Sequence, residues 1–182
     1  MARAVGGANQ ADPARLSPLL GGVGAAPCTL TIRERGLCVK IVIPAETRAG
    51  EKRVAMMPSV VRKFTQLGFD VAVQSGAGRE AFADDAAYTE AEAQVFDEAA
   101  LTEQIAGADV VASVRPLDYG RASRLRRGGV SISFLSPAQD TETIKALRDA
   151  GATGLSSDLL PRMSRAQSTD ALTSQALAAG YR

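Results

Sequence analysis

Residues 39–74 read VKIVIPAETRAGEKRVAMMPSVVRKFTQLGFDVAVQ, in which two short apolar runs enclose a segment with helical spacing. The runs at 39–43 and 71–74 are rich in Val and Ile, which is typical of buried strands. Between them, apolar residues recur at i, i+1, i+4 and i+7 and so share one face of a helix: Val60, Val61, Phe64 and Leu67. Pro58 suits the first turn of that helix, and Gly68 suits its end. The segment therefore predicts a strand, a crossover helix and a second strand.

The same alternation continues toward the C-terminus. Three further apolar runs predict strands at 110–113, 130–134 and 152–156. Asp140 can cap a helix that ends before Gly151, and residues 98–105 predict a third, shorter helix. Short apolar strands that alternate with helices are typical of βαβ units, so the sequence predicts an α/β fold with a parallel sheet.

Composition limits the chemistry of the chain. The 182 residues include no His, which removes the usual general base near neutral pH and the Ser-His and Cys-His nucleophile pairs. Cys28 and Cys38 cannot supply a four-thiolate zinc site or a disulfide framework, and they suit a reducing cytosol. Lys and Arg number 21 and Asp and Glu 20, so a net charge of +1 gives no general attraction to nucleic acid. Most hydrolase functions are therefore disfavoured.

Residues 1–38 differ in composition from the rest of the chain. They are rich in Gly, Ala, Pro and Arg and show no sustained apolar period, which is typical of a disordered extension. A signal peptide is the alternative, but Ser, Pro and Gly residues interrupt its apolar centre at 16–23. No apolar run approaches the roughly 20 residues of a membrane-spanning helix. We expect a disordered extension at 1–38 and one domain at 39–182.

A glycine-rich motif follows the second predicted strand. Gly76-Ala77-Gly78-Arg79-Glu80-Ala81 matches the G-x-G-x-x-A start of a dinucleotide-binding loop. Such a loop requires a long helix from its third small residue and an acidic residue at the end of a strand about 20 positions on. Here residues 82–85 favour a turn, and Asp97 and Glu98 lie at a predicted helix start. The sequence favours a glycine-rich bend over a dinucleotide fingerprint.

Arg53 lies between the first strand and the helix predicted to begin near Pro58. In an open parallel sheet this loop belongs to the edge where ligands bind. The Arg53 guanidinium could hold a carboxylate or phosphate, or it could form a surface ion pair with Glu46 or Glu51. Position alone leaves both interpretations open.

A basic cluster surrounds a pair of glycines at 128–129, and its members are Arg121, Arg124, Arg126 and Arg127. No aromatic residue interleaves the cluster, so it lacks the stacking surface of a single-strand binder. Charge runs of this kind are usually a solvated helix end and turn, which is the structure we expect.

The densest polar segment is residues 161–174, PRMSRAQSTDALTS. Ser164 and Gln167 have the spacing of a helix capping box. Arg162, Asp170 and Thr173 join Gln167 in placing a charge, an amide and two further oxygens within one loop and one helical turn. That set could grip a polar ligand, so capping and ligand binding both stay open from the residues alone.

Several of these motifs resemble the N-terminal domain shared by alanine dehydrogenases and proton-translocating nicotinamide nucleotide transhydrogenases. The matching motifs are KIVIPAET at 40–47, RVA at 53–55 with Pro58, and QSGAG at 74–78. FLSPAQ at 134–139 and the run at 161–172 narrow the resemblance to the transhydrogenase alpha subunit, over residues 39–182. The resemblance implies an α/β fold with a doubly wound, mostly parallel sheet, the flavodoxin-like or Rossmann-like first half of an NAD(H)-binding component.

The resemblance also separates the two activities of the family. Alanine dehydrogenases carry a catalytic His in the motif at 134–139 and a substrate Lys just after the strand that ends near Ser113. This chain has Ser136 and Ser113 at these places. Arg53 alone, which would belong to a substrate-like pocket, does not restore reductive amination, so an alanine dehydrogenase is disfavoured.

In transhydrogenases, the loop that matches 162–170 contacts NAD(H) near its nicotinamide. The cofactor-binding residues implied by the resemblance are Arg162, Ser164, Gln167, Ser168, Asp170 and Thr173, the last in place of the usual Ser. Arg162 and Gln167 would hold the carboxamide and nearby oxygens, and Asp170 would orient Arg162 or the loop backbone. No catalytic side chain and no metal is expected, because the cofactors perform the chemistry.

The implied activity is hydride transfer between NAD(H) and NADP(H), coupled to proton translocation. A partner domain would bind NADP(H), membrane-embedded subunits would couple the proton, and the full complex would contain a homodimer. The chain would then be cytoplasmic, peripheral to the inner face of the cell membrane. The resemblance places the NAD-binding Rossmann half beyond Arg182, so it is expected to be absent from 39–182 and the chain to be inactive alone. The alternative is a truncated, non-catalytic fragment or interaction module.

Overall fold

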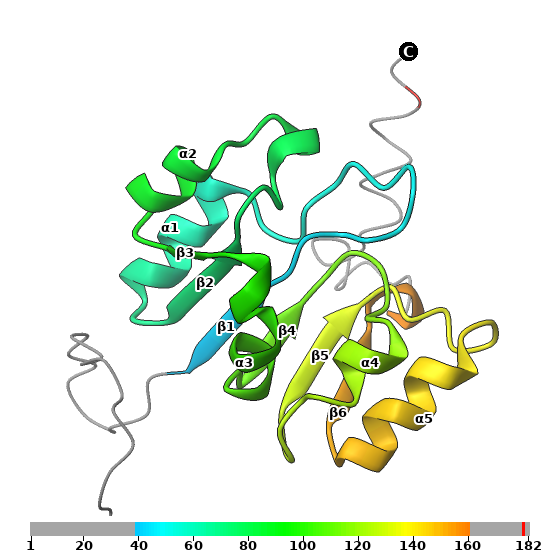
Figure 1. Cartoon of the computed structure of the whole chain (residues 1–182). Coiled ribbons are helices and arrows are strands. Elements are labelled where there is room, and N and C mark those ends of the chain that lie inside the picture. The colour runs from blue at the N-terminus through cyan, green and yellow to red at the C-terminus, as the bar shows by residue number, and fades with distance from the viewer. Residues whose placement is uncertain (1–38, 161–179, 181–182) are drawn as a thin grey trace, which may run out of the picture.

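A computed structural model describes residues 39–160 and Gly180 (Figure 1). Six strands form one sheet in the order β3-β2-β1-β4-β5-β6, and every neighbouring pair is parallel. The strands are β1 Lys40–Ile43, β2 Asp70–Gln74, β3 Gln94–Phe96, β4 Val110–Ala112, β5 Val130–Ser133 and β6 Thr153–Ser156. The prediction of an α/β fold with a doubly wound parallel sheet is confirmed, and the strand order is that of a Rossmann sheet.

Five of the six strands lie where the sequence predicts them, within one residue at each end. The remaining strand, β3, is not predicted from the sequence. This strand has three residues, of which Gln94 is exposed and Val95 is half-buried, so no apolar run marks it.

Helices connect the strands. They are α1 Pro58–Gln66, α2 Asp85–Glu90, α3 Leu101–Ala106, α4 Tyr119–Ala122 and α5 Thr141–Ala150, with the 3-10 turns η2 Arg79–Ala81, η3 Glu98–Ala100 and η4 Ser157–Leu159. The predicted helices are confirmed as α1, α5 and the continuous pair η3 and α3. In α5, the Asp140 side chain accepts a hydrogen bond from the Thr143 N–H at 3.2 Å, and Gly151 ends the helix with a φ of 68°.

Two short helices, α2 and α4, are not predicted by the sequence. The expected turn at 82–85 is correct for Phe82, which has a φ of 59°, but wrong for its second half. There, Asp84 caps α2 by accepting a hydrogen bond from the Ala87 N–H at 2.9 Å. With six and four residues, α2 and α4 are too short for an apolar period to identify them.

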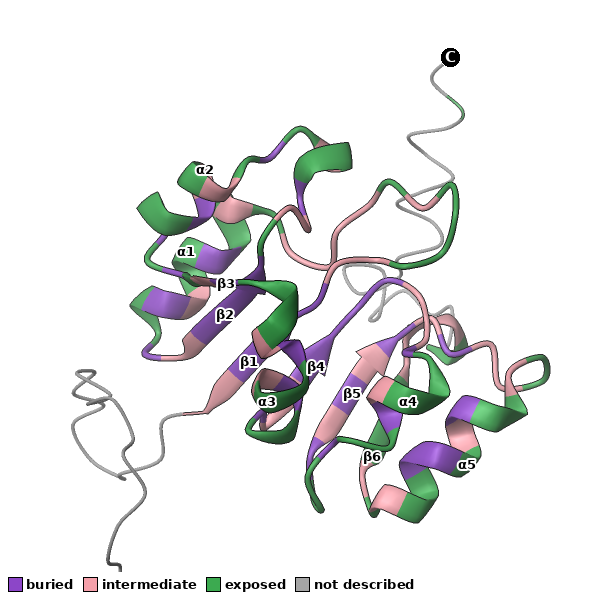
Figure 2. Cartoon of the chain, in the orientation of Figure 1, coloured by how far each residue is buried: buried purple, intermediate pink, exposed green. Residues whose placement is uncertain are grey.

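Each face of the sheet has its own core (Figure 2). On one face, Val42 and Val111 pack with buried residues of α3, α4 and α5. On the other face, Ile43 packs with Val61 of α1 and Tyr88 of α2. Parallel strands bury both faces in this way, which explains why β1 and β4 read as apolar runs without alternation.

The segments that follow β1, β4 and β5 meet at one edge of the sheet, because the carboxyl ends of parallel strands share an edge. Within residues 39–160 and at Gly180, no helix has the length and apolarity needed to cross a bilayer. The extension predicted at 1–38 and the polar segment at 161–174 lie outside the described residues.

Candidate functional site

The strand order reverses between β1 and β4, and open α/β sheets bind ligands at such a point. Glu46, in the loop after β1, reaches across this point. Its carboxylate accepts hydrogen bonds from the backbone N–H groups of Val114, at 2.6 Å, and Arg115, at 3.1 Å. Burial raises the pKa of Glu46 above its usual value of 4.5, although the two backbone hydrogen bonds oppose that rise. Glu46 therefore ties the loop at 44–57 to the segment after β4.

Arg53 is held in the same loop by Glu51. Nε and Nη2 of Arg53 each lie 2.6 Å from an oxygen of the Glu51 carboxylate, and Nε of Arg115 donates to that carboxylate at 2.8 Å. The Glu51 side chain is 5% exposed, and the hydrogen bond from Arg53 lowers its pKa to about 2. The structure shows an ion pair of Arg53 with Glu51, and the interpretation of Arg53 as a ligand-holding residue stays a prediction.

A cavity of about 570 Å³ opens beside Arg53. Its lining includes Met56 from the first loop, Ser113 from the end of β4 and Phe134 from the end of β5. The guanidinium carbon of Arg53 lies 5.9 Å from the centre of the Phe134 ring, within cation–π range. The Ser113 hydroxyl donates to the Arg115 carbonyl at 2.7 Å. The lining also includes the charged residues Lys52 and Glu80. The arrangement suits the binding of a flat group with polar substituents, because apolar walls lie beside two cations and a carboxylate.

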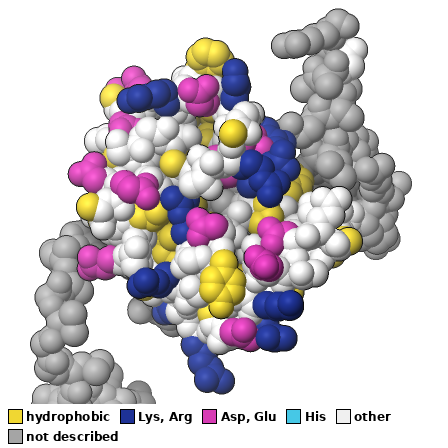
Figure 3. All heavy atoms as spheres, turned by 45° about the vertical axis from the view of Figure 1, so that its right-hand side comes forward, with side chains coloured by type: hydrophobic (Ala, Val, Ile, Leu, Met, Phe, Trp, Pro, Cys, Tyr) yellow, Lys and Arg dark blue, Asp and Glu magenta, His cyan; other side chains and the backbone are white. Residues whose placement is uncertain are grey.

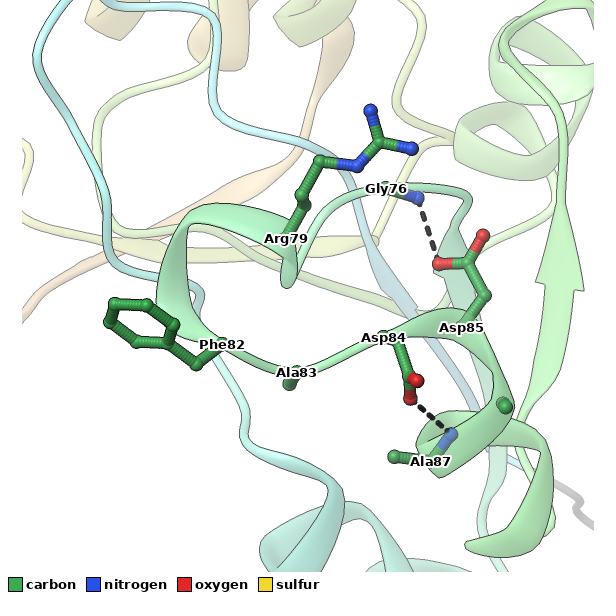
Figure 4. A pocket seen from close by; sticks show the side chains of 8 residues that line it. Gly76, Arg79, Phe82, Ala83, Asp84, Asp85 and Ala87 are labelled. Atoms are coloured by element: carbon green, nitrogen blue, oxygen red, sulfur yellow. Dashed lines mark hydrogen bonds between the residues drawn. The ribbon is translucent and has the colours of Figure 1, made fainter.

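The glycine-rich motif forms a bend and not a dinucleotide loop, as the sequence favours (Figure 4). A Cβ on Gly78 would lie 2.7 Å from Cε2 of Tyr88, so the absence of a side chain serves the packing of Tyr88. Asp85 closes the bend by accepting hydrogen bonds from the Ser75 hydroxyl at 2.6 Å and the Gly76 N–H at 2.9 Å. These bonds, with Ser75 contributing most, lower the pKa of Asp85.

The four arginines of the basic cluster have different environments. Arg124 and Arg127 are exposed, as expected for a solvated helix end, and Arg126 forms an ion pair with Asp109. The prediction is wrong for Arg121, whose side chain is only 17% exposed and contacts Ala45, Glu98 and Asp118. Acidic and basic side chains are intermixed on the face shown in Figure 3.

The remaining predicted positions divide into two groups. Ser136 follows β5 with a φ of 43°, and its N–H donates to the Asp158 carboxylate at 3.0 Å. Outside the described residues lie Arg162, Ser164, Gln167, Ser168, Asp170 and Thr173. The structure therefore brings Arg53, Ser113 and the start of the 134–139 motif to one edge. The roles of Glu46 and Arg115 are not predicted from the sequence, because no local motif indicates a hydrogen bond to a distant backbone group.

Residues 42–179 match the family model described as the N-terminal domain of alanine dehydrogenase/PNT. The chain belongs to this family. This alanine dehydrogenase/PNT N-terminal domain is 42% identical over 144 residues to the NAD(P) transhydrogenase subunit alpha of Cereibacter sphaeroides. It is 40% identical over 149 residues to an NAD(P) transhydrogenase alpha subunit polypeptide of Rhodospirillum rubrum, and 34% identical over 118 residues to the alanine dehydrogenase of Mycobacterium tuberculosis.

These three alignments cover 79%, 79% and 64% of this chain but 27%, 38% and 31% of the relatives, so the chain spans about a quarter to two-fifths of their length. Among solved structures, the transhydrogenase from Sinorhizobium meliloti superposes with a TM-score of 0.72 at 38% identity, over 78% of this chain and 42% of that one. An L-alanine dehydrogenase superposes with a TM-score of 0.60 at 25% identity, over 65% and 32%. In these comparisons the domain is more similar to the transhydrogenases than to the alanine dehydrogenases.

Proposed function

We propose that this domain supplies the nicotinamide-facing side of an NAD(H) site in an NAD(P) transhydrogenase, where hydride passes between NAD(H) and NADP(H). The observation that carries the proposal is the cavity of about 570 Å³ at the reversal of strand order, in a domain about 40% identical to transhydrogenase alpha subunits. Bound nicotinamide supplies the hydride chemistry. The residues of this chain bind the ring, orient it and exclude water.

The described residues fit one end of a dinucleotide. The walls formed by Met56 and Phe134 could accept a flat ring, and the Arg53–Glu51 pair at the rim would then lie beside polar groups of the ligand. The bend at 76–81 does not fit a pyrophosphate, because no long helix starts there and the Tyr88 side chain occupies the space beside Gly78. The adenosine and pyrophosphate would therefore be held by protein outside these residues.

The polar segment after η4 completes this proposed site. We assign nicotinamide contacts to Arg162, Ser164, Gln167, Ser168, Asp170 and Thr173. In this assignment the Arg162 guanidinium and the Gln167 amide hydrogen-bond the carboxamide, and the Asp170 carboxylate orients Arg162. The chain leaves η4 at Leu160, on the same sheet edge as the cavity, which supports the assignment.

The proposal extends to the assembly. The domain would work with a component that binds NADP(H) and with membrane-embedded subunits that couple proton movement. It would be a homodimer in that complex and would lie against the inner face of the cell membrane. An NAD-binding Rossmann half, supplied outside 39–182, would hold the rest of NAD(H).

Titration with NADH, followed by its fluorescence, tests the function. We expect the purified full chain to bind NADH weakly or not at all when alone. After mixing with the polypeptides encoded next to it, we expect saturable binding and hydride transfer to NADP⁺. Absence of NADH binding in every such mixture contradicts the proposal.

A combined variant tests the residue assignment. Replacing Arg162, Gln167 and Asp170 together by Ala removes charge-assisted hydrogen bonds, so the NADH affinity of the reassembled complex should fall about tenfold or more. Arg148→Ala is the matched control, because this exposed arginine of α5 forms its ion pair with the adjacent Asp149. Equal NADH affinities for the combined variant and wild type would contradict the assignment of nicotinamide contacts to these three residues.

A further inference from the structure

Side chains from other elements hold both backbone polar groups of Ala45. The Ala45 N–H donates to Oε1 of Gln74, on β2, at 2.8 Å. The Ala45 carbonyl accepts from Nη1 of Arg121, on α4, at 3.2 Å. Ala45 is the second residue after β1, so these two bonds fix the chain where it leaves the sheet toward Glu46.

Glu98, the first residue of η3, joins the two side chains that hold Ala45. Its carboxylate accepts a hydrogen bond from Nε2 of Gln74, and its other oxygen lies 3.5 Å from Nη2 of Arg121. The contacts therefore run from the Ala45 N–H through Gln74, Glu98 and Arg121 back to the Ala45 carbonyl. We name these four residues the Ala45 ring.

The environment of Arg121 is specific to a guanidinium. Its Nη1, Nη2 and Nε contact Ala45, Glu98 and, at 3.3 Å, Asp118. A guanidinium presents donors in a fixed planar fork and can serve three separate acceptors, whereas an ammonium is a single compact centre. Arg124, on the next turn, is exposed.

The Ala45 ring lies at the root of the loop that forms the cavity rim. The residue after Ala45 is Glu46, which bonds to the backbone of Val114 and Arg115. Further along the same loop, Glu51 holds Arg53. A shift of the Ala45 peptide would therefore move Glu46 away from Val114 and displace Arg53 from the cavity.

We propose that Arg121 is a positioning residue that acts through Ala45, together with Gln74 and Glu98, to hold the 44–57 loop in the geometry of the cavity. Its importance for nicotinamide binding rests on the function proposed above. The basic cluster thus contains one residue that serves the site from a distance. Arg121 is not one of the residues that line the cavity.

Amide hydrogen exchange of the nucleotide-free full chain tests this role. In Arg121→Ala, exchange should accelerate about tenfold at Ala45, Val114 and Arg115, which is the effect of losing one or two charge-assisted hydrogen bonds. The Ala152 amide, which donates to Leu147 at 2.9 Å far from the ring, should keep its rate. Arg124→Ala is the matched control and should leave all four amides unchanged.

Arg121→Lys keeps the charge and most of the side-chain length, so it replaces Arg121→Ala in the exchange experiment if the Ala variant does not fold. It should accelerate the same three amides by a smaller factor, because an ammonium cannot serve all three acceptors at once. Acceleration confined to 121–125 would show that Arg121 only stabilises α4, and would overturn the proposal. Equal exchange at Ala45, Val114 and Arg115 in Arg121→Lys and wild type would overturn it as well.

NADH binding and amide exchange are measured as two independent tests. In the reassembled complex, Arg121→Lys should raise the NADH dissociation constant several-fold, whereas Arg124→Ala should not. If wild type binds no NADH in any mixture, the proposed function fails, while the exchange rates still decide whether Arg121 positions the loop. If wild type binds NADH and Arg121→Lys binds it equally well, the link from Arg121 to the site is wrong.

Discussion

A carboxylate oxygen of Glu46 lies 2.6 Å from the backbone nitrogen of Val114, which is 68 residues further along the chain. This bond and the hydrogen bond from the Arg115 N–H connect the loop after β1 to the segment after β4, where the strand order reverses. Two loops that belong to different halves of the sheet therefore form one rim around the cavity.

Glu46→Ala should lower the free energy of unfolding by about 2 kcal/mol, because the buried Val114 N–H and the Arg115 N–H lose their acceptor. Chemical denaturation of the full chain measures the change. Glu103→Ala removes an exposed carboxylate from α3 and should change stability by less than about 0.5 kcal/mol. Equal stabilities for the two variants would show that the Glu46 bonds contribute nothing net.

The ion pair between Glu51 and Arg53 predicts a loss of stability in acid. The pKa of Glu51 is about 2 in the folded chain and ordinarily 4.5, so the folded state favours the ionised form. The resulting stabilisation is fully present above about pH 4.5 and is lost as the pH falls toward 2. Glu51→Gln cannot ionise and lacks this contribution.

Urea denaturation of wild type and Glu51→Gln at neutral pH and near pH 3 measures that contribution. The difference in unfolding free energy between the two proteins should shrink as the pH falls through this range. Groups that do not interact with Glu51 cancel in the difference, whereas Glu46 does not cancel fully, because the charge of Glu51 helps to raise the pKa of Glu46. A difference that stays constant with pH would mean that Glu51 is not preferentially ionised in the fold.

Gly78→Ala should be more damaging than Gly76→Ala, although both change the same bend. A Cβ on Gly78 would lie 2.7 Å from Tyr88 and from the Ala83 carbonyl, which should cost about 1–3 kcal/mol of overpacking. A Cβ on Gly76 meets no atom within 4 Å, so only its φ of 75° opposes the substitution, by about 1 kcal/mol.

Denaturation of the single and double variants tests the Gly78 contact. Combining Gly78→Ala with Tyr88→Ala should cost less than the sum of the single changes, because the second substitution removes the clash with Tyr88 while that with the Ala83 carbonyl remains. Strict additivity would show that Tyr88 is not the reason for the glycine.

Asp140→Ala should lower the free energy of unfolding by about 1 kcal/mol, since it removes the cap of α5 and leaves the Thr143 N–H without its side-chain acceptor. Thermal unfolding followed by circular dichroism measures the loss. Asp149→Ala is the control at the other end of α5, where the side chain is 59% exposed and a negative charge opposes the helix dipole. It should leave stability unchanged or slightly raised, and a loss equal to that of Asp140→Ala would exclude capping as the cause.

Local patterns predict much of this fold because they report on neighbours along the chain. The apolar face of α1 and the Asp140 and Gly151 ends of α5 are examples. The same reasoning fails for β3 and α2, which are too short to show a period. It also leaves open whether Arg53 binds a ligand or forms an ion pair, and the partner in the observed pair, Glu51, depends on how the loop folds back on itself.

The amino-acid sequence is sufficient to predict the α/β class, most strand and helix positions, the lack of an imidazole for acid–base chemistry, and the family motifs. The folded chain is needed to show that Glu46 bonds to Val114, that Glu51 pairs with Arg53, and that Arg121 is not a solvated surface arginine. The Glu46–Val114 and Arg121–Ala45 bonds join segments that are far apart in the sequence, and the order of strands in the sheet brings these segments together. Glu51 and Arg53 are only two residues apart, so their pairing depends on the conformation of the 44–57 loop, which residue spacing does not specify.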